Sequence, residues 1–367
     1  MIPGSFKIIR NLFVLFYNSC ILQQFKIETI MDYSSLTIVR PPGVDSSWSL
    51  RDHLGAIRVR SSIGRGRYRV NPGLYRLGQA EKDSEVIVTS NYKLSFDLVR
   101  KSLDGMNAWI LVLETYGINV WCASAKGTFG TDELIRQVDE SRLNQYVSHR
   151  RLIIPQLGAP GVSAHRVKEE TGFSVKFGPV RAGDIKEYIS NGYKKNEATR
   201  SVRFNFMDRL KLTPVEIVNS IGYLLAVIIF FFLLSGIHAG GYSISLVWKD
   251  GLRAGLHLLA AYLSGAFLGP LLLPFLPFRQ FGGKGMVIGF IVFGLIGILS
   301  FSSMSYLTLI GWFLISGAVS SFLTMNFTGA STYTSLSGVR KEMRIFVPVQ
   351  ILFVLTGLSF IVIAKLV

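Results

Sequence analysis

The chain has 367 residues, a net charge of +16 and a mean hydropathy of +0.39, which is too apolar for an ordinary soluble protein. Only 8 of its 39 Lys and Arg residues and 3 of its 23 Asp and Glu residues lie in 212–367. This distribution separates a basic, water-facing part from a membrane part, and excludes a soluble enzyme, a disordered chain and a purely membrane-embedded transporter. Two cysteines, Cys20 and Cys122, exclude a disulfide framework and an iron–sulfur cluster held only by cysteines of this chain.

Residues 1–60 are expected to form an N-terminal extension. An apolar stretch at 6–22 is interrupted by Arg10, and no small-residue cleavage site follows it. The stretch is therefore short for a membrane span and poorly matched to a signal peptide. Met31 is an alternative translation start to Met1.

Residues 61–195 alternate apolar runs with helical patterns, and are expected to form one α/β domain. Strands are predicted at 85–90, 108–113, 152–155 and 173–177. Helices are predicted at 94–103, 131–147, 163–171 and 182–190. This alternation predicts a mostly parallel, Rossmann-like sheet with right-handed crossovers, in which ligands bind at the carboxyl ends of the strands.

Three loops should meet at that edge of the sheet, at 90–92, 115–130 and 156–162. In the middle loop, Asn119 is expected to cap a short helix that begins at Val120. Cys122 then lies in the first turn, where the helix N-terminus favours a thiolate. The alternative is a buried core cysteine without a chemical role, the usual state of a lone cysteine. The histidine spacing supplies neither a base for a nucleophilic cysteine nor a zinc site.

Residues 196–214 are expected to be a basic linker, and 215–367 an all-α transmembrane bundle of about five helices. A bilayer core takes about 20 apolar helical residues. Spans are predicted at 215–237, 252–276, 286–301, 305–325 and 345–365. Pro270 and the prolines after it should kink or end the second span. No span carries a central acidic residue, which favours a packed anchor bundle over a transporter.

Basic clusters precede the first span, follow the second and precede the fifth, so all fall on one side of a five-span bundle. They are Lys194, Lys195, Arg200, Arg203, Arg209 and Lys211, then Arg279 and Lys284, then Arg340, Lys341 and Arg344. The positive-inside rule places 1–211 in the cytoplasm, with the bundle in the cytoplasmic (inner) membrane. Cationic loops beside membrane spans are also a more ordinary source of this charge than nucleic-acid binding.

The segment Asn119–Lys126 reads NVWCASAK. It resembles the cap-helix motif of the HgcA family of mercury-methylating corrinoid proteins, Asn-(Val/Ile)-Trp-Cys-Ala-(Ala/Ser)-Gly-Lys. Seven of the eight positions agree, and Ala125 stands where that family has Gly. The resemblance covers about 65–190. More broadly, the domain is similar to the corrinoid-binding part of the corrinoid iron–sulfur protein of acetyl-CoA synthesis, whose cluster-binding region is not found in this chain.

The resemblance implies a cobalamin-type corrinoid whose cobalt takes the Cys122 thiolate as its lower axial ligand. Such a donor favours a higher cobalt oxidation state, and so lowers the cost of releasing a methyl group to Hg(II). The resemblance also implies corrinoid contacts from the cap helix and its neighbouring loops. These are Asn119, Val120, Trp121, Cys122, Ala123, Thr89, Asn91, Thr128, Phe129, Gly130, Thr131, Gly158 and Gly161.

The function implied is a membrane-anchored corrinoid-dependent methyltransferase that forms methylmercury. A separate [4Fe–4S] ferredoxin-type protein would supply electrons, and a donor of the methyltetrahydrofolate type would supply methyl groups. One alternative is a corrinoid methyl carrier of one-carbon metabolism with another acceptor. The other is a membrane transport or sensory protein whose cytoplasmic domain binds a ligand.

Overall fold

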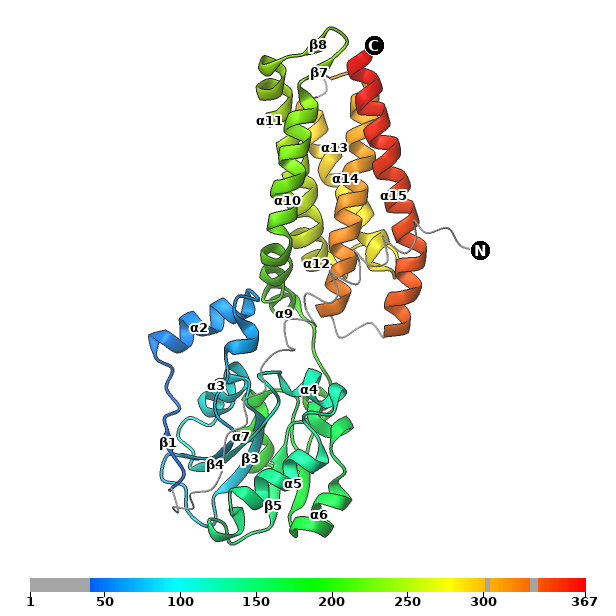
Figure 1. Cartoon of the computed structure of the whole chain (residues 1–367). Coiled ribbons are helices and arrows are strands. Elements are labelled where there is room, and N and C mark those ends of the chain that lie inside the picture. Colours follow the sequence, from blue (N-terminus) through cyan, green and yellow to red (C-terminus); the bar gives the residue numbers. More distant parts are fainter. Residues whose placement is uncertain (1–39, 301–303, 331–335) are drawn as a thin grey trace, which may run out of the picture. The chain divides into compact units, whose positions relative to one another are not determined.

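The computed structural model describes residues 40–300, 304–330 and 336–367, and the chain divides into two compact units (Figure 1). Unit 1 contains the described residues up to Val59 together with Gly64–Ser201. Unit 2 contains Arg60–Ile63 and Val202–Val367. The apolar stretch 6–22, with Cys20, lies outside the described residues.

Unit 1 is built on a six-stranded sheet with the order β1-β2-β4-β3-β5-β6. The strands are β1 (Gly43–Val44), β2 (Gly73–Leu77), β3 (Glu85–Ser90), β4 (Ala108–Leu113), β5 (Arg151–Ile154) and β6 (Ser174–Phe177). All pairs are parallel except β2 with β4. The expected α/β domain with a mostly parallel sheet is confirmed, whereas β1 and β2 at one edge were not predicted.

Seven helices of unit 1 connect or flank these strands. They are α2 (Leu50–Arg60), α3 (Lys93–Ser102), α4 (Val120–Lys126), α5 (Thr131–Glu140), α6 (Ala164–Thr171), α7 (Ile185–Ser190) and α8 (Glu197–Arg200). The prediction of one helix over 131–147 is wrong at its end. Arg142 adopts a left-handed φ of 48°, which stops α5 and starts the 3-10 turn η3 (Leu143–Gln145). Residues 156–162, predicted as a loop, contain the 3-10 segment η4 (Gln156–Gly161).

The two faces of the sheet bury two separate apolar clusters. Val86 and Val88 of β3 point into a cluster that contains residues of α4, α5 and α6, whereas Ile87 points into one that contains residues of α3 and α7. All six residues of β4 are buried. Strands covered on both faces are apolar throughout, which explains why continuous apolar runs marked β3 and β4 in the sequence.

A buried ion network ties α2 and the segment before it to α3. Asp97 is 2% exposed and pairs with Lys93 at 2.6 Å and Arg100 at 2.8 Å. Asp52 pairs with the same two cations at 2.5 Å and 2.8 Å. Burial disfavours the charged form of Asp52, but the hydrogen bonds from Lys93 and Ser49 together outweigh burial and hold its pKa well below the ordinary value. Trp48 adds a 2.9 Å hydrogen bond from its indole to the main-chain oxygen of Asp97.

Unit 2 is helical. Its elements are α9 (Phe206–Leu210), α10 (Thr213–Ser235), the hairpin of β7 (Ile237–His238) and β8 (Gly241–Tyr242), α11 (Ile244–Leu263), the π-helical η6 (Ser264–Leu268), α12 (Gly269–Leu272), α13 (Phe281–Ser300), α14 (Tyr306–Asn326), η8 (Phe327–Ala330) and α15 (Leu336–Leu366). Among the described residues, four helical stretches are long and apolar enough to cross a membrane: Phe206–Ser235, Ile244–Leu272, Tyr306–Asn326 and Ser337–Leu366.

The third expected span, 286–301, corresponds to α13, whose described apolar part, Phe281–Gly297, is shorter than the four membrane-length stretches. The second span ends as predicted at its prolines. Pro270 has no N–H to donate, and the chain passes through η6 just before it and leaves the helix after Leu272.

Small residues bring the helices of unit 2 into close contact. A Cβ at Gly289 of α13 would lie 2.7 Å from the Ser316 oxygen of α14, and one at Gly311 of α14 would lie 2.7 Å from the Gly357 oxygen of α15. A Cβ at Gly294, by contrast, would meet open space. Tight packing through glycine is how apolar helices associate without a hydrophobic driving force.

The ion network predicts a large, local effect on stability. Replacing Asp97 by Ala leaves Lys93 and Arg100 partly uncompensated, and should lower the free energy of unfolding of unit 1 by about 3 kcal/mol. Glu140→Ala, which removes an exposed partner of Arg136, is the matched control and should cost less than about 1 kcal/mol. Hydrogen exchange of the β3 and β4 amides in the full chain measures both, and equal effects of the two changes would contradict this account.

Candidate cofactor-binding site

The three predicted loops meet at one edge of the sheet. β3 lies between β4 and β5 and runs parallel to both, with Ser90 at the end of β3 opposite Leu113 at the end of β4. The segments after these strands therefore emerge side by side. They are Ser90–Tyr92, the turn leading into α4, and η4 after β5.

The side chain of Asn91 makes four hydrogen bonds at this edge, and only 1% of the residue's surface is exposed. Its Oδ1 accepts hydrogen bonds from the Thr115 amide at 3.2 Å, the Thr115 hydroxyl at 2.9 Å and the Gly117 amide at 2.9 Å. Its Nδ2 donates to Glu114 Oε1 at 2.6 Å. One buried side chain thus fixes the backbone that follows the neighbouring strand.

The turn after β4 uses two left-handed residues, Tyr116 with φ of 57° and Gly117 with φ of 73°. A Cβ at position 117 would also lie 3.0 Å from the Gly66 oxygen. Both the positive φ and this close approach therefore favour glycine at this position. Glu114 Oε1 accepts from the Tyr116 amide at 2.6 Å, and Glu133 of α5 accepts from the Glu114 amide at 2.6 Å. Burial raises the pKa of Glu133.

Helix α4 begins as the sequence predicts. Asn119 is its N-cap, and its Oδ1 accepts from the Cys122 amide at 2.9 Å. Val120 and Ala123 are buried in the core beneath the helix, whereas Trp121 is 42% exposed and the free thiol of Cys122 is exposed. The alternative of a buried core cysteine is therefore excluded by the structure.

Ala125 lies within α4 and is exposed. Its φ is not positive, and the left-handed position at the end of the helix is Gly127, with φ of 80°. Alanine is the best helix former, so its presence at position 125 adds no backbone strain.

Glycines lock the far end of α4 against η4. A Cβ at Gly158 would lie 2.6 Å from the Phe129 ring, and one at Gly161 would lie 2.3 Å from the Phe129 oxygen and 2.9 Å from Ser124 Oγ. Thr131 accepts from the Ser163 amide at 2.9 Å. These contacts leave the cap helix little freedom to shift along η4.

Two hydroxyl groups remain unpaired near this edge within the part of the chain that the structure describes. Thr89 Oγ1 and Ser90 Oγ are fully buried and have no hydrogen-bond partner. Ser90 shares the face of β3 with Val86 and Val88, which pack into the cluster that contains Val120 and Ala123 of α4. An unpaired buried hydroxyl below the cap helix is compatible with a polar ligand there.

The predicted contact residues are close together but differ in access. Trp121 and Cys122 are exposed, and Asn119, Thr128, Thr131 and Gly161 are partly exposed. The others are buried in this structure, namely Thr89, Asn91, Val120, Ala123, Phe129, Gly130 and Gly158. Their contact with a cofactor stays a prediction.

Sequence analysis missed the carboxylates of Glu114 and Glu133, which support the turn before α4. The only local signal was an acidic residue directly after β4. Among the described residues, no group of three or more His, Cys, Asp or Glu side chains could hold a metal ion. A metal at Cys122 would therefore need further ligands from a cofactor.

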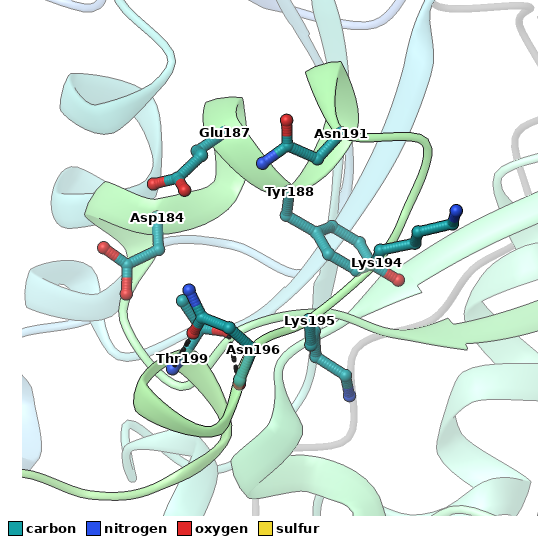
Figure 2. A pocket seen from close by; sticks show the side chains of 8 residues that line it. All are labelled: Asp184, Glu187, Tyr188, Asn191, Lys194, Lys195, Asn196 and Thr199. Atoms are coloured by element: carbon teal, nitrogen blue, oxygen red, sulfur yellow. Dashed lines mark hydrogen bonds between the residues drawn. The ribbon is translucent and has the colours of Figure 1, made fainter.

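A separate depression of about 410 Å³ lies beside α7 and α8 (Figure 2). It is lined by Asp184, Glu187, Tyr188, Asn191, Lys194, Lys195, Asn196 and Thr199. Burial, with a smaller contribution from Arg200, lowers the pKa of Lys195, which also donates a hydrogen bond to Gln156 of η4. None of the residues predicted to contact a cofactor lines this depression.

Unit 1 is similar in sequence to subunits of two named enzyme complexes. Residues 24–189 match the family CdhD, described as the CO dehydrogenase/acetyl-CoA synthase delta subunit. The gamma subunit of the acetyl-CoA decarbonylase/synthase complex of Archaeoglobus fulgidus is 32% identical over 131 residues, which cover 35% of this chain and 27% of that subunit. The gamma subunit of Methanopyrus kandleri is 31% identical over 122 residues, covering 33% of this chain and 26% of the subunit.

The chain thus spans about a quarter of the length of the curated relatives it matches (27% and 26%). The family match ends at residue 189, before the segment Val202–Val367 that forms most of unit 2. Unit 1 is therefore similar in sequence to subunits of CO dehydrogenase/acetyl-CoA synthase. This agrees with the broader resemblance found in the sequence, and the narrower resemblance to the HgcA family goes beyond these matches.

The cap of α4 predicts a local change in stability. Asn119→Ala removes the acceptor for the Cys122 amide and should destabilise α4 by about 1 kcal/mol, which corresponds to about fivefold faster amide exchange over Val120–Lys126. Asn196→Ala removes the equivalent cap of α8, whose acceptor bonds the Thr199 amide, and is the matched control. If amide exchange in α4 is unchanged by Asn119→Ala, or is changed equally by Asn119→Ala and Asn196→Ala, then Asn119 does not stabilise α4 as its N-cap.

Proposed function

We propose, on the basis of the similarity of unit 1 to subunits of CO dehydrogenase/acetyl-CoA synthase, that unit 1 binds a corrinoid and transfers methyl groups. The observation that carries the proposal is the exposed thiol of Cys122 on a capped helix at the carboxyl edge of a parallel sheet. That edge is where ligands bind in open α/β sheets.

Cys122 is proposed as the lower axial ligand of the corrinoid cobalt. Cys122 lies in the first turn of α4, and its thiol is exposed to solvent. Asn119 accepts a hydrogen bond from the Cys122 amide and so fixes the backbone that carries the thiol. When bound, a corrinoid supplies the cobalt–carbon bond from which a methyl group is transferred. The thiolate is a strong donor, which favours a higher oxidation state of the metal it binds.

The proposed acceptor is Hg(II), which makes methylmercury the product. This choice is supported by the segment Asn119–Lys126, because seven of its eight residues agree with the cap-helix motif of mercury-methylating proteins. The second candidate is a methyl carrier of one-carbon metabolism with another acceptor. It is favoured by the similarity to gamma subunits of the acetyl-CoA decarbonylase/synthase complex.

We also propose that unit 2 anchors the chain in the cytoplasmic membrane, with unit 1 on the cytoplasmic side. The four membrane-length helices and the clustered Lys and Arg residues support this arrangement. Digestion of unit 1 by added protease in sealed inverted vesicles, but not in right-side-out vesicles, tests it. A separate [4Fe–4S] ferredoxin-type protein is the proposed electron donor, and a methyltetrahydrofolate-type compound the proposed methyl donor.

The ligand role of Cys122 predicts a spectroscopic difference between the two cysteines. The full chain, loaded with cobalamin without oxygen, should show a cobalt absorption spectrum that changes in Cys122→Ala and stays unchanged in Cys20→Ala. The physical reason is that replacing a thiolate by water weakens electron donation to the metal. Identical spectra of the wild type and Cys122→Ala would remove Cys122 from the coordination sphere.

The choice of acceptor predicts the fate of the methyl group in a single turnover. Chain loaded with isotopically labelled methylcobalamin should transfer the label to Hg(II), and Cys122→Ala should lose most of this transfer while Cys20→Ala keeps it. Methylmercury quantified by mass spectrometry provides the measurement. Corrinoid that binds normally but yields no labelled methylmercury would favour the one-carbon carrier instead.

A further inference from the structure

Helix α2 has two apolar faces, and the described residues of unit 1 bury one of them. Gly55, Ala56 and Val59 are buried against the rest of the unit. Leu50 and Leu54, on the opposite side, are 74% and 58% exposed. Ile57 continues this stripe at the i, i+4, i+7 spacing of a helical face and is 63% exposed. These three side chains, Leu50, Leu54 and Ile57, form the α2 stripe.

Positive charge borders the α2 stripe. Arg51 and Arg58 lie beside it on one flank and Arg60 on the other, by helical geometry. Residues 50–69 contain six arginines and a single acidic residue, Asp52. That carboxylate is engaged by Lys93 and Arg100 in the buried network, so it does not offset the charge at the surface.

The stripe is held in place rather than exposed by loose packing. Asp52 accepts hydrogen bonds from the Ser49 amide at 2.9 Å and the Ser49 hydroxyl at 2.8 Å, which fixes the start of the helix. A Cβ at Gly55 would lie 2.3 Å from the Tyr68 hydroxyl, so α2 sits directly on that ring. The helix also packs with Tyr92 and Leu94, which directly follow β3 at the carboxyl edge of the sheet. In Figure 1, α2 lies along the outside of unit 1.

We propose that α2 docks on an anionic membrane surface, with the α2 stripe inserted among the lipids and Arg51 and Arg58 on lipid phosphates. A short helix with aliphatic residues on one face and arginines along its flanks is the pattern of interfacial membrane helices. Lipid phosphates match the arginines in charge and geometry. The proposal rests on the membrane anchoring of unit 2.

The covalent connection to unit 2 favours a membrane over a protein partner. Residues 202–205 join unit 1 to a stretch, Phe206–Ser235, that is long and apolar enough to cross a bilayer. Such a tether raises the effective concentration of α2 at the membrane surface, so that three apolar side chains and a few arginines suffice for docking. Because α2 packs beside the end of β3, docking would restrain the edge of the sheet that carries α4.

The test places an environment-sensitive fluorophore on the α2 stripe of the full chain. Leu54→Cys is labelled in a background of Cys20→Ser and Cys122→Ser, and the protein is reconstituted into vesicles of phosphatidylcholine with or without phosphatidylglycerol. His165→Cys, on α6 with a side chain that is 83% exposed, is the matched control. Emission wavelength and quenching by brominated lipids are measured at about 0.1 M salt, where the screening length is about 10 Å.

Docking predicts blue-shifted, lipid-quenched emission at position 54 only in vesicles with phosphatidylglycerol, and none at position 165. Replacing Arg51 and Arg58 by Gln should lower the ratio of docked to undocked label about 30-fold, from about fivefold for each arginine. Both arginines are exposed and outside the buried network, so the fold should be retained.

Two results would overturn the docking. The first is a label at position 54 that stays as water-exposed as the one at 165. The second is a label shielded equally in detergent, neutral vesicles and anionic vesicles, which would assign the stripe to residues 1–39 or to a second copy. Flotation after an alkaline wash separates this test from the anchoring of unit 2. Protein that does not float contradicts the anchor and the docking together, whereas floating protein with a water-exposed label contradicts the docking alone.

Discussion

The site depends on the hydrogen bonds of one buried amide, that of Asn91. The Asn91 side chain accepts hydrogen bonds from the Thr115 and Gly117 amides and the Thr115 hydroxyl, and donates one to the Glu114 carboxylate. An unsatisfied amide at this depth would cost about 1–3 kcal/mol, so the turn after β4 is held where Asn91 places it. The turn leads directly into α4, and so positions the exposed side chains of Trp121 and Cys122.

The same edge combines rigidity with one reactive group. The Gly158 and Gly161 backbones approach Phe129 too closely for any side chain, which fixes α4 from the other end. A helix held at both ends and capped by Asn119 exposes Cys122 without needing a neighbouring base. This suits a ligand that must keep its position through repeated transfers, because a fixed donor needs no rearrangement.

Local patterns in the sequence predicted local structure well. Continuous apolar runs identified β3 and β4, and the Asn119 cap with Cys122 in the first turn followed from the spacing of three residues. Long-range contacts were out of reach: the role of Asn91 depends on residues more than 20 positions away. The left-handed Arg142 ended α5 early with no glycine or proline to mark it. The stripe of α2 was hidden because residues 1–60 were expected to be an extension.

The central claim is that the Cys122 thiolate binds the cobalt of a corrinoid. X-ray absorption at the cobalt edge of the loaded full chain measures this directly, because sulfur scatters more strongly than nitrogen or oxygen in the first shell. The account predicts one sulfur ligand in the wild type and in Cys20→Ala, and none in Cys122→Ala. A first shell of only nitrogen and oxygen in the loaded wild type would contradict it.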